Sequence, residues 1–304
     1  MQVSIIIVNY NTSALLLQCI ESIYKNVQCV EYEIIVADNC SREEQKSLLR
    51  NNEKFKLIEL PQNLGFGKAN NAAAELAKGD YLFLLNPDTT LINDAVSILY
   101  NYMEKHQNVG ICGGNLFDGE MKPTHSFHRI FPGFLSELDF ATGKVYRQVR
   151  YGNNSQFNHT SDALPVAMIT GADLMIRHSV WNMLHGFDPV FFMYYEDADL
   201  CKRCSENKYD IMSVPAAHIQ HLEGKSFTES KAHCERNLDG RFNYFYKHYP
   251  IGYNKLTDLM NIGSLAMATF LFRCIGKKAA SYNYGQRLRI YKESCSKTHF
   301  DRKS

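Results

Sequence analysis

Two short acidic motifs have the residue types and spacing to carry chemistry. The first is Asn86-Pro87-Asp88, which directly follows an apolar run at 81–85. A carboxylate here, with an amide oxygen two residues earlier, could hold Mg²⁺ or Mn²⁺, and such cations bind readily together with substrate phosphates. The same three residue types are strong turn formers, so the tripeptide alone leaves a metal site and a simple turn both open.

The second motif is Glu196-Asp197-Ala198-Asp199, which follows an aromatic run at 191–195. Acids at the start of a helix are favoured by capping and by the helix dipole, which is the structural explanation. A carboxylate behind an aromatic wall also suits a general base that removes a proton from a sugar hydroxyl. Taken alone, the motif supports both readings equally.

A glycine-containing stretch at 63–67 and a single histidine, His221, add further candidates. Gly65 and Gly67 could let the backbone approach a ligand, but Asn70 occupies the third glycine position of a dinucleotide-binding fingerprint. The stretch also follows the third predicted strand and not the first, which argues against a dinucleotide site. A lone histidine is usually structural, yet His221 could complete a metal site begun by Asp88.

Strands and helices alternate along the first part of the chain. Apolar runs predict strands at 3–8, 33–37, 55–60, 81–85 and 109–112. Helices are predicted between them at 15–23, 41–51, 66–78 (capped by Gly79) and 93–105. This alternation predicts an open, mostly parallel sheet flanked by helices, and ligands of such sheets bind beyond the carboxyl ends of the strands.

The second part of the chain is predicted in coarser terms. A strand, turn and strand are expected over 164–177, a helix over 197–207, a strand over 211–214 ended by Pro215, and helices after His233. We predict a domain at 1–240, with a nucleotide-binding half at 1–115 and an acceptor and catalytic half at 116–240. A basic, partly apolar helical extension is predicted at 241–304.

Charge is spread unevenly over the 304 residues. The net charge is +1, which gives no global indication of nucleic-acid binding. The segment 241–304 holds 12 Lys and Arg against three acids, so an anionic partner for this tail and a solvated basic tail are both open. Within it, 256–272 is mostly apolar but too short and polar to span a membrane with confidence. An interfacial helix on anionic lipid, a buried helix and a dimer contact are the alternatives.

The N-terminus and the cysteines bear on the compartment. The chain opens directly on an apolar strand without the features of a signal peptide, and its nine cysteines have no framework spacing. These observations favour a reducing cytoplasm, with a peripheral place at the inner membrane face as a further expectation.

Read in order, several segments resemble the family 2 glycosyltransferases, and in particular their rhamnosyltransferase-like members. The resemblance covers about residues 3–245, and its order and spacing make it specific although each piece is weak. The segments that carry it are 3–11, 37–41, 63–71, 85–89, 171–172, 186–188, 192–201 and 221–226.

The resemblance implies a GT-A fold and an inverting transfer of a sugar from a nucleoside diphosphate sugar to a glycan or a lipid-linked glycan. It implies a donor site formed by Asn9, Tyr10, Asn11, Asp38, Asn63, Gly65, Asn71 and Asn86. It implies Mg²⁺ or Mn²⁺ held by Asp88 and His221, with Asn86 standing where a full D-x-D motif has Asp. It implies Asp197 as general base, Glu196 or Asp199 positioning base or acceptor, and an acceptor site at Gly171, Ala172 and Tyr195.

Other functions stay open from the sequence. A nucleotidyltransferase would share the sheet and the acids but typically has a Gly-rich, basic phosphate loop after the first strand, and residues 9–13 contain no Gly, Lys or Arg. A nucleotide-sugar-binding module without turnover is the other alternative, against which the presence of Asp38, Asp88 and Asp197 together argues. The resemblance favours a rhamnosyl donor on thymidine diphosphate, with UDP-N-acetylhexosamine or UDP-galactose as alternatives.

Overall fold

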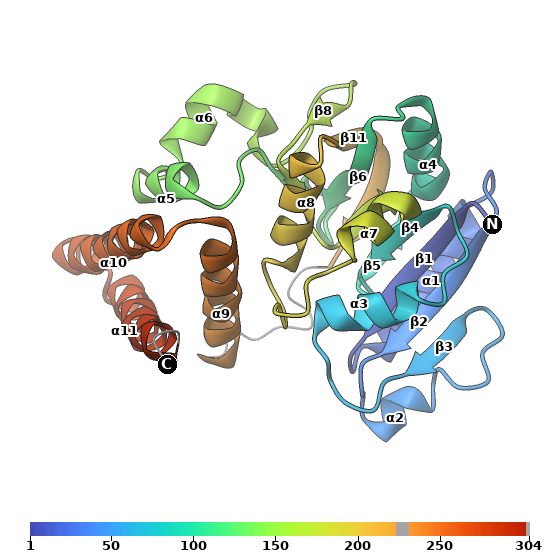
Figure 1. Cartoon of the computed structure of the whole chain (residues 1–304), viewed down its shortest axis with the longest axis horizontal. Helices are drawn as coiled ribbons and strands as arrows, with labels where there is room; N and C mark the ends of the chain where they lie inside the picture. The colour runs from blue at the N-terminus through green and yellow to red at the C-terminus, as the bar shows by residue number, and fades with distance from the viewer. Residues whose placement is uncertain (223–230, 302–304) are drawn as a thin grey trace. The chain divides into compact units, whose positions relative to one another are not determined.

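A computed structural model of the chain describes residues 1–222 and 231–301. Contacts between Cα atoms divide it into two compact units. The first comprises 1–131, 151–192 and 196–228, and the second 132–150, 193–195 and 229–304. The helices and strands, labelled as in Figure 1, are as follows: β1 Val3–Asn9, α1 Ser13–Asn26, β2 Tyr32–Asp38, α2 Glu43–Lys46, β3 Lys56–Glu59, α3 Phe66–Ala74, β4 Tyr81–Leu85, β5 Thr89–Leu91, α4 Ala95–Lys105, β6 Val109–Phe117, β7 Phe127–His128, α5 Phe134–Ala141, α6 Val145–Tyr151, the 3₁₀ helix Gly152–Ser155, β8 Leu164–Pro165, β9 Met168–Ile169, β10 Asp173–Arg177, α7 His178–Leu184, α8 Glu196–Glu206, β11 Asp210–His221, α9 Lys231–His248, α10 Ile251–Cys274 and α11 Lys278–Asp301.

The first unit is built on a nine-stranded sheet whose path runs β3-β2-β1-β4-β10-β6-β11-β5, with β8 paired to β11. Strands β3, β2, β1 and β4 are parallel, β10 runs antiparallel between β4 and β6, and β11 is parallel to β6. The predicted mostly parallel sheet is therefore confirmed. β7 and β9 form a separate two-stranded sheet.

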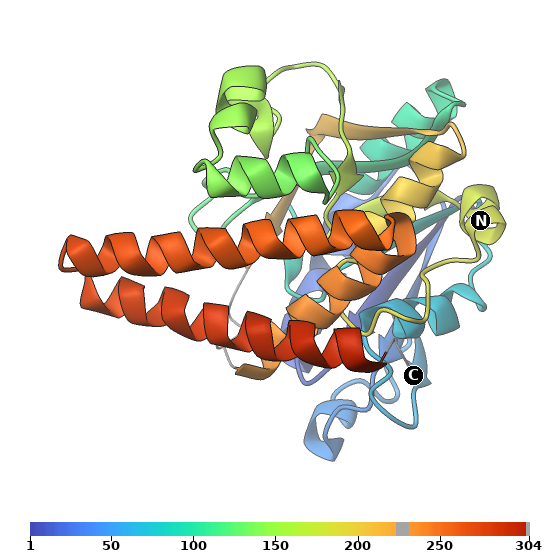
Figure 2. The same cartoon turned by 60° about the vertical axis from the view of Figure 1, so that its left-hand side comes forward.

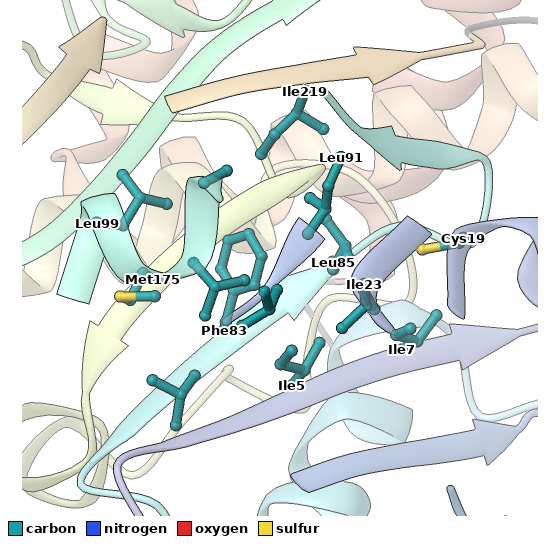
Figure 3. Packing of buried hydrophobic residues seen from close by; sticks show 14 of the residues in the cluster. Ile5, Ile7, Cys19, Ile23, Phe83, Leu85, Leu91, Leu99, Met175 and Ile219 are labelled. Carbon is teal, nitrogen blue, oxygen red and sulfur yellow. The ribbon is translucent and has the colours of Figure 1, made fainter. Parts of the chain in front are cut away.

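One face of the sheet holds a large apolar core. Alternate residues of a strand point to opposite faces, and Ile5 and Ile7 of β1 accordingly lie in one buried cluster with Ile23 of α1, Phe83 of β4 and Leu99 of α4 (Figure 3). α3 contacts β1 and β2, while α7 contacts β10 and α8 contacts β6, β9 and β11. This packing makes the sheet a rigid base for the residues at its strand ends.

Several predicted elements have different bounds in the structure; for example, the strand predicted at 109–112 continues to Phe117 as β6. The helix predicted at 41–51 is only the single turn α2, because this polar segment buries little besides Leu49. The helix predicted to reach residue 78 ends at Ala74, so Gly79 is not its cap. A Cβ at Gly79 would lie 2.4 Å from the Ser4 nitrogen, so close backbone packing explains this glycine.

The strand predicted to end at Pro215 instead continues to His221. The pairing of β11 with β6 shifts register between Ser213 and His218, and such an irregularity accommodates a proline inside a strand. The correction matters for function because it places His221 at the end of a strand of the central sheet.

The second unit is helical, and α10 and α11 run side by side in it (Figure 2). Its apolar cluster includes Phe242 of α9, Leu265 of α10 and Tyr291 of α11. α9 is continuous through residue 240, so the predicted division between 240 and 241 falls inside a helix. Among the described residues, no helix combines the length and apolar character that crossing a membrane requires.

Candidate active site

The strand ends of the first unit position the first acidic motif at one edge of the sheet. β4 ends at Leu85, and the first residue of the antiparallel strand β10, Asp173, pairs with Leu85. At the other end of the path, His221 of β11 pairs with Thr89 of β5. The segment that follows β4 therefore lies between the start of β10 and the end of β11.

Asn86, Asp88 and His221 converge in this segment. The His221 Nε2 atom lies 3.3 Å from Asp88 Oδ1 and 3.5 Å from Asn86 Nδ2. The Asp88 carbonyl accepts a hydrogen bond of 3.0 Å from the Leu222 N–H, and Thr89 Oγ1 donates to the Asn86 carbonyl at 2.7 Å. Both Asp88 and His221 are buried. The backbone therefore fixes all three side chains in one place.

The residues present fit a divalent cation that shares its coordination with a substrate. The donor set is one carboxylate, one imidazole and one amide, which are oxygen and nitrogen ligands of the kind that Mn²⁺ accepts. Within the described ranges, no group of three or more His, Cys, Asp and Glu side chains could hold a metal ion. Mg²⁺ and similar ions commonly take one or two carboxylates and complete their shell with substrate phosphates and water, which such a sparse set requires.

Glu196 and Asp197 lie at the first turn of α8. Asp197 accepts hydrogen bonds from the N–H groups of Ala198 (2.8 Å) and Gly171 (3.2 Å). Burial raises the pKa of Asp197, and these two N–H donors partly oppose the rise. Burial, and to a smaller extent the neighbouring Asp197 charge, raise the pKa of Glu196 to about 8. Two neighbouring carboxyls cannot both ionise easily, and the proton favours Glu196, which is the more buried of the two side chains.

Gly171 and Ala172 connect the two acidic motifs. The Gly171 N–H donates to Asp197, while the carbonyl of Ala172 accepts a hydrogen bond of 3.0 Å from the Asn86 N–H. Two consecutive residues thus link the carboxylate at the start of α8 to the cluster of Asn86, Asp88 and His221. The structure therefore brings together six of the residues predicted for catalysis, metal binding and acceptor binding: Asp88, Gly171, Ala172, Glu196, Asp197 and His221.

The predicted nucleotide end lies at the carboxyl ends of β1 and β2. Asn9 donates to Asp38 Oδ1 at 2.8 Å, and the other oxygen of Asp38 accepts a hydrogen bond from the Ser41 N–H at 2.9 Å. Ser41 Oγ in turn accepts from the Asn11 N–H at 2.8 Å. Asn9 and Asp38 are fully buried, whereas Tyr10 is 49% exposed. The buried pair therefore shapes the turn, and Tyr10 presents a ring against which a base could stack.

A second turn beside it is held by asparagine side chains. Asn39 Nδ2 donates to Asn63 Oδ1 (3.0 Å) and to the Gly65 carbonyl (3.2 Å), and Asn39 Oδ1 accepts from the Leu64 N–H at 2.8 Å. If Asn63 and Gly65 bind the donor as predicted, they do so from a turn whose shape these hydrogen bonds fix. The sequence placed Asn39 at a strand end and in the segment 37–41 that carries the resemblance, but gave it no specific role.

Gly65 allows a close approach that no other residue would tolerate. Its φ is +83°, and a Cβ here would lie 2.1 Å from the Phe192 carbonyl oxygen, which accepts a hydrogen bond of 2.9 Å from the Phe66 N–H. We expect Gly65→Ala to lower the free energy of unfolding by about 1–3 kcal/mol, because strain at a positive φ adds to the steric clash. Urea unfolding measures this, with Gly119→Ala as control, since a Cβ at Gly119 meets its nearest atom at an ordinary 3.4 Å. Equal stability of the two variants would contradict the prediction.

Asn71, predicted to bind the nucleotide, is engaged with the backbone of Phe187. Its amide donates to the Phe187 carbonyl at 2.8 Å and accepts from the Phe187 N–H at 3.0 Å. Both ends of the side chain therefore hold the turn at 186–187 against α3, and the structure gives Asn71 a supporting place.

Asp199 lies apart from Asp197 although it is only two residues further along α8. It is fully buried and forms an ion pair with Arg203, one turn on, at 2.7 Å. Arg203 also donates to the carbonyls of Leu184 and Gly186. Residues two apart project from different sides of a helix, so we infer that Asp199 ties α8 to the end of α7.

We expect Asp199→Ala to destabilise the fold by about 3 kcal/mol, because removing one partner leaves a largely buried guanidinium uncompensated. Asp199→Asn can still accept from Arg203, so a smaller loss and retained transfer activity are expected. The matched control on the same helix is Glu206→Ala, which breaks a more exposed pair with Lys202 and should cost under about 1 kcal/mol. Loss of activity in a fully stable Asp199→Asn protein would instead indicate a direct role in catalysis.

Two further residues complete the account of the site. Tyr195, predicted for the acceptor, belongs to the second unit, where its ring lies 5.7 Å from that of Tyr244. Asp173 was not predicted. It is fully buried, burial raises its pKa well above the usual range, and it accepts a hydrogen bond of 2.6 Å from the Gly114 N–H. A single acid opening an otherwise apolar strand was the available signal.

Comparison with known proteins decides the family. The model of glycosyl transferase family 2 matches residues 4–169, which is more than half of the chain. The chain belongs to glycosyl transferase family 2. The predicted family is thereby confirmed, and with it the assignment of the chain as a glycosyltransferase.

The similar curated proteins of this family include rhamnosyltransferases. The chain is 29% identical over 238 residues to rhamnosyltransferase WbbL of Escherichia coli K12, covering 74% of this chain and 86% of that protein. It is 24% identical over 216 residues to the N-acetylglucosaminyl-diphospho-decaprenol L-rhamnosyltransferase of Mycobacterium tuberculosis, covering 64% of this chain and 67% of that protein. These matches confirm the predicted resemblance to rhamnosyltransferase-like members.

A solved structure with the same fold is the mannosyltransferase PcManGT of Pyrobaculum calidifontis, determined in complex with GDP-mannose and Mn²⁺. The two proteins superpose with a TM-score of 0.59 at 18% identity, covering 98% of this chain and 83% of that one. This similarity, together with the sheet order, confirms the predicted GT-A fold with a helical C-terminal region.

Proposed function

We propose that this glycosyltransferase moves a sugar from a nucleoside diphosphate sugar to a hydroxyl of a glycan acceptor, with inversion at the anomeric carbon, in the synthesis of a cell-surface polysaccharide. The observation that carries the proposal is the link through Gly171 and Ala172. It holds a half-buried carboxylate, that of Asp197, which can accept a proton, next to a cluster that can hold a metal ion and a diphosphate.

Asp197 is the general base in this proposal. The acceptor hydroxyl is a weak nucleophile, so a carboxylate must take its proton while the oxygen attacks the anomeric carbon and the bond to the diphosphate breaks. Asp197 remains ionised because Glu196 holds the proton of the pair and because two backbone N–H groups donate to its oxygens. Its position at the first turn of α8 adds the favourable field of a helix N-terminus.

Asp88 and His221, with Asn86 beside them, would hold Mg²⁺ or Mn²⁺. When bound, such an ion stabilises the negative charge that develops on the departing diphosphate. The Mn²⁺ in the structure of PcManGT supports this choice of ion. Tyr10 and Asn11 would face the nucleotide, with Asn9 and Asp38 behind them, and the turn at 63–65 would lie against the donor.

The donor and acceptor are proposed from the relatives. Two are rhamnosyltransferases, which favours a rhamnosyl donor on thymidine diphosphate, with UDP-N-acetylhexosamine and UDP-galactose as alternatives. The mycobacterial relative is named for a sugar on a diphosphate-linked polyprenol. We therefore propose a lipid-linked glycan as the acceptor class.

The proposal is tested by measuring binding of these three donors to the purified chain by calorimetry, with Mn²⁺ and without it, and by following release of nucleoside diphosphate. We expect one donor to bind only with the metal and to be hydrolysed slowly in the absence of acceptor. Binding without any turnover, even with acceptor glycans, would favour a binding module. Release of pyrophosphate from a nucleoside triphosphate and a sugar 1-phosphate would favour a nucleotidyltransferase, and either result would overturn the proposal.

A further inference from the structure

Helix α10 of the second unit has its polar and apolar faces reversed. A helix on the surface of a water-soluble unit normally buries its apolar face and exposes its polar one. In α10 the buried residues include Asn254, Thr257 and Asp258. The exposed residues include a run of large apolar side chains at helical spacing, which we call the outer stripe: Leu256, Leu259, Met267, Phe270 and Leu271, followed by Ile275 just past the helix.

A buried polar network fixes this orientation of α10. Arg241 of α9 donates to Asp258 at 2.8 Å and to Glu137 of α5 at 3.2 Å. Tyr291 of α11 donates to the same oxygen of Asp258 at 2.7 Å, and Asn261 donates to Glu137 at 2.6 Å. Turning α10 to bury its outer stripe would break these contacts and leave Arg241 buried without its acceptors. The outer stripe is thus held toward the surroundings by the fold of the unit itself.

The exposed charges of α10 itself and of the turn that follows it all have one sign. Over residues 251–282, every one of which the structure describes, the exposed charged side chains are Lys255, Arg273, Lys277 and Lys278. The single acid of this stretch, Asp258, is buried. The two lysines lie at the turn between α10 and α11, so positive charge borders the apolar stripe at both of its ends.

We propose that the outer stripe of α10 docks on the surface of a membrane that contains anionic lipid, with α10 lying in the plane of the interface. Apolar side chains flanked by Lys and Arg are what an interfacial helix requires, because the apolar face enters the acyl boundary while the basic side chains meet acidic headgroups. A second copy of the chain would bring like charges together. A nucleic acid would match the charge but would leave the apolar stripe uncovered.

The inference is independent of the proposed sugar transfer, since it rests on the second unit alone. It does suggest a role for the helical extension. An enzyme docked in this way would encounter a lipid-linked acceptor by diffusion in the plane of the membrane. Figures 1 and 2 show α10 and α11 as a long antiparallel pair.

The test is flotation of the full chain with vesicles of phosphatidylcholine, with and without phosphatidylglycerol. We expect the wild type to float with the anionic vesicles only, and the floated fraction to fall as salt rises. Leu259→Glu with Phe270→Glu should reduce the floated fraction at least tenfold, because these two side chains lie three turns apart on one stripe and are 66% and 64% exposed. Lys277→Glu with Lys278→Glu should remove the preference for anionic vesicles.

Matched controls distinguish docking from general stickiness. Leu48→Glu and Lys105→Glu alter exposed side chains of the first unit and should float as the wild type does. An unchanged melting temperature for each variant shows that the fold is intact, as expected for exposed positions. Wild type that fails to float, or a stripe variant that floats normally, would overturn the inference. So would a wild-type dimer that ignores vesicles and becomes monomeric in the stripe variant, because a second copy would then cover the stripe.

Discussion

Asp197→Asn is expected to lower kcat by a factor of about 10²–10⁴, the usual contribution of a positioned general base. Donor binding should stay unchanged, because the amide keeps the size of the carboxylate and the metal cluster is formed by other residues. Calorimetric titration with donor and Mn²⁺, together with single-turnover transfer to an acceptor, measures the two effects separately. A variant with wild-type turnover would show that another group accepts the proton.

The pH profile gives an independent reading of the same residue. Burial raises the pKa of Asp197, and the base must be ionised to act, so kcat is expected to rise as the pH increases through that raised pKa. Glu196→Gln is the matched variant, because a neutral amide imitates the protonated Glu196. It should keep most of the activity at neutral pH and leave the rising limb close to its wild-type position, since residue 196 is uncharged in both proteins while Asp197 ionises.

The same pair should also make the folded protein progressively less stable as the pH rises from acid to just above neutral. A carboxyl whose pKa is higher in the folded state than in the unfolded chain binds its proton more tightly when folded, so stability is lost as the pH rises past the unfolded pKa toward the folded one. For Glu196 this interval runs from about the ordinary glutamate value to about 8. Sites that hold perturbed carboxyls commonly trade stability for function in this way.

Buried strands could be predicted from the sequence because they read as unbroken apolar runs. Val3–Asn9 and Tyr81–Leu85 were recognised almost to the residue, and the polar residues that follow them were therefore placed correctly at one edge of the sheet. The surface helix at 41–51 failed for the opposite reason. Its polar composition has helical propensity but no apolar face, and tertiary packing supports only one turn.

The convergence of His221 on Asp88 could not be derived from local pattern. It depends on β11 continuing past Pro215 through a register shift and then pairing with β5, which no spacing in the sequence encodes. The link between Asp197 and Asn86 through residues 171–172 likewise depends on β10 entering the sheet antiparallel to β4. The resemblance to the family identified the site residues, whereas the sheet topology explains why they lie close together.

The chemical role of an individual side chain could not be predicted from the sequence where it depends on burial and on neighbouring groups. Asp197 and Asp199 look equivalent in a run of acids, yet one accepts from backbone N–H groups and the other is neutralised by Arg203. Asn71 and Asp38 match motif positions that the family resemblance assigns to nucleotide binding, and the structure shows both of them holding backbone turns.

Asp88→Ala is expected to weaken binding of Mn²⁺ in the presence of nucleoside diphosphate by at least about 100-fold. Residues that merely orient metal ligands typically contribute 10- to 100-fold to affinity, so loss of the sole carboxylate of the cluster should cost no less. Paramagnetic resonance of Mn²⁺ measures the bound fraction without requiring turnover. His221→Ala should weaken binding by a smaller factor, because a neutral imidazole contributes no charge to the site.

Asp80→Ala is the control for this effect, since Asp80 is an exposed carboxylate just before β4, at the opposite end of the strand from Asp88. It should bind Mn²⁺ as the wild type does. Equal affinity in the Asp80→Ala and Asp88→Ala proteins would show that Asp88 is not part of the metal site.

The contrast between the Asp88 and Asp197 variants then separates metal and donor binding from transfer in the proposed reaction. Asp88→Ala should lose metal and donor together, whereas Asp197→Asn should retain both and fail only in transfer. Asn86 is joined to Ala172 by a backbone hydrogen bond, and an amide oxygen at position 197 can still accept from the Gly171 N–H, so neither substitution is expected to disturb the geometry of the other half.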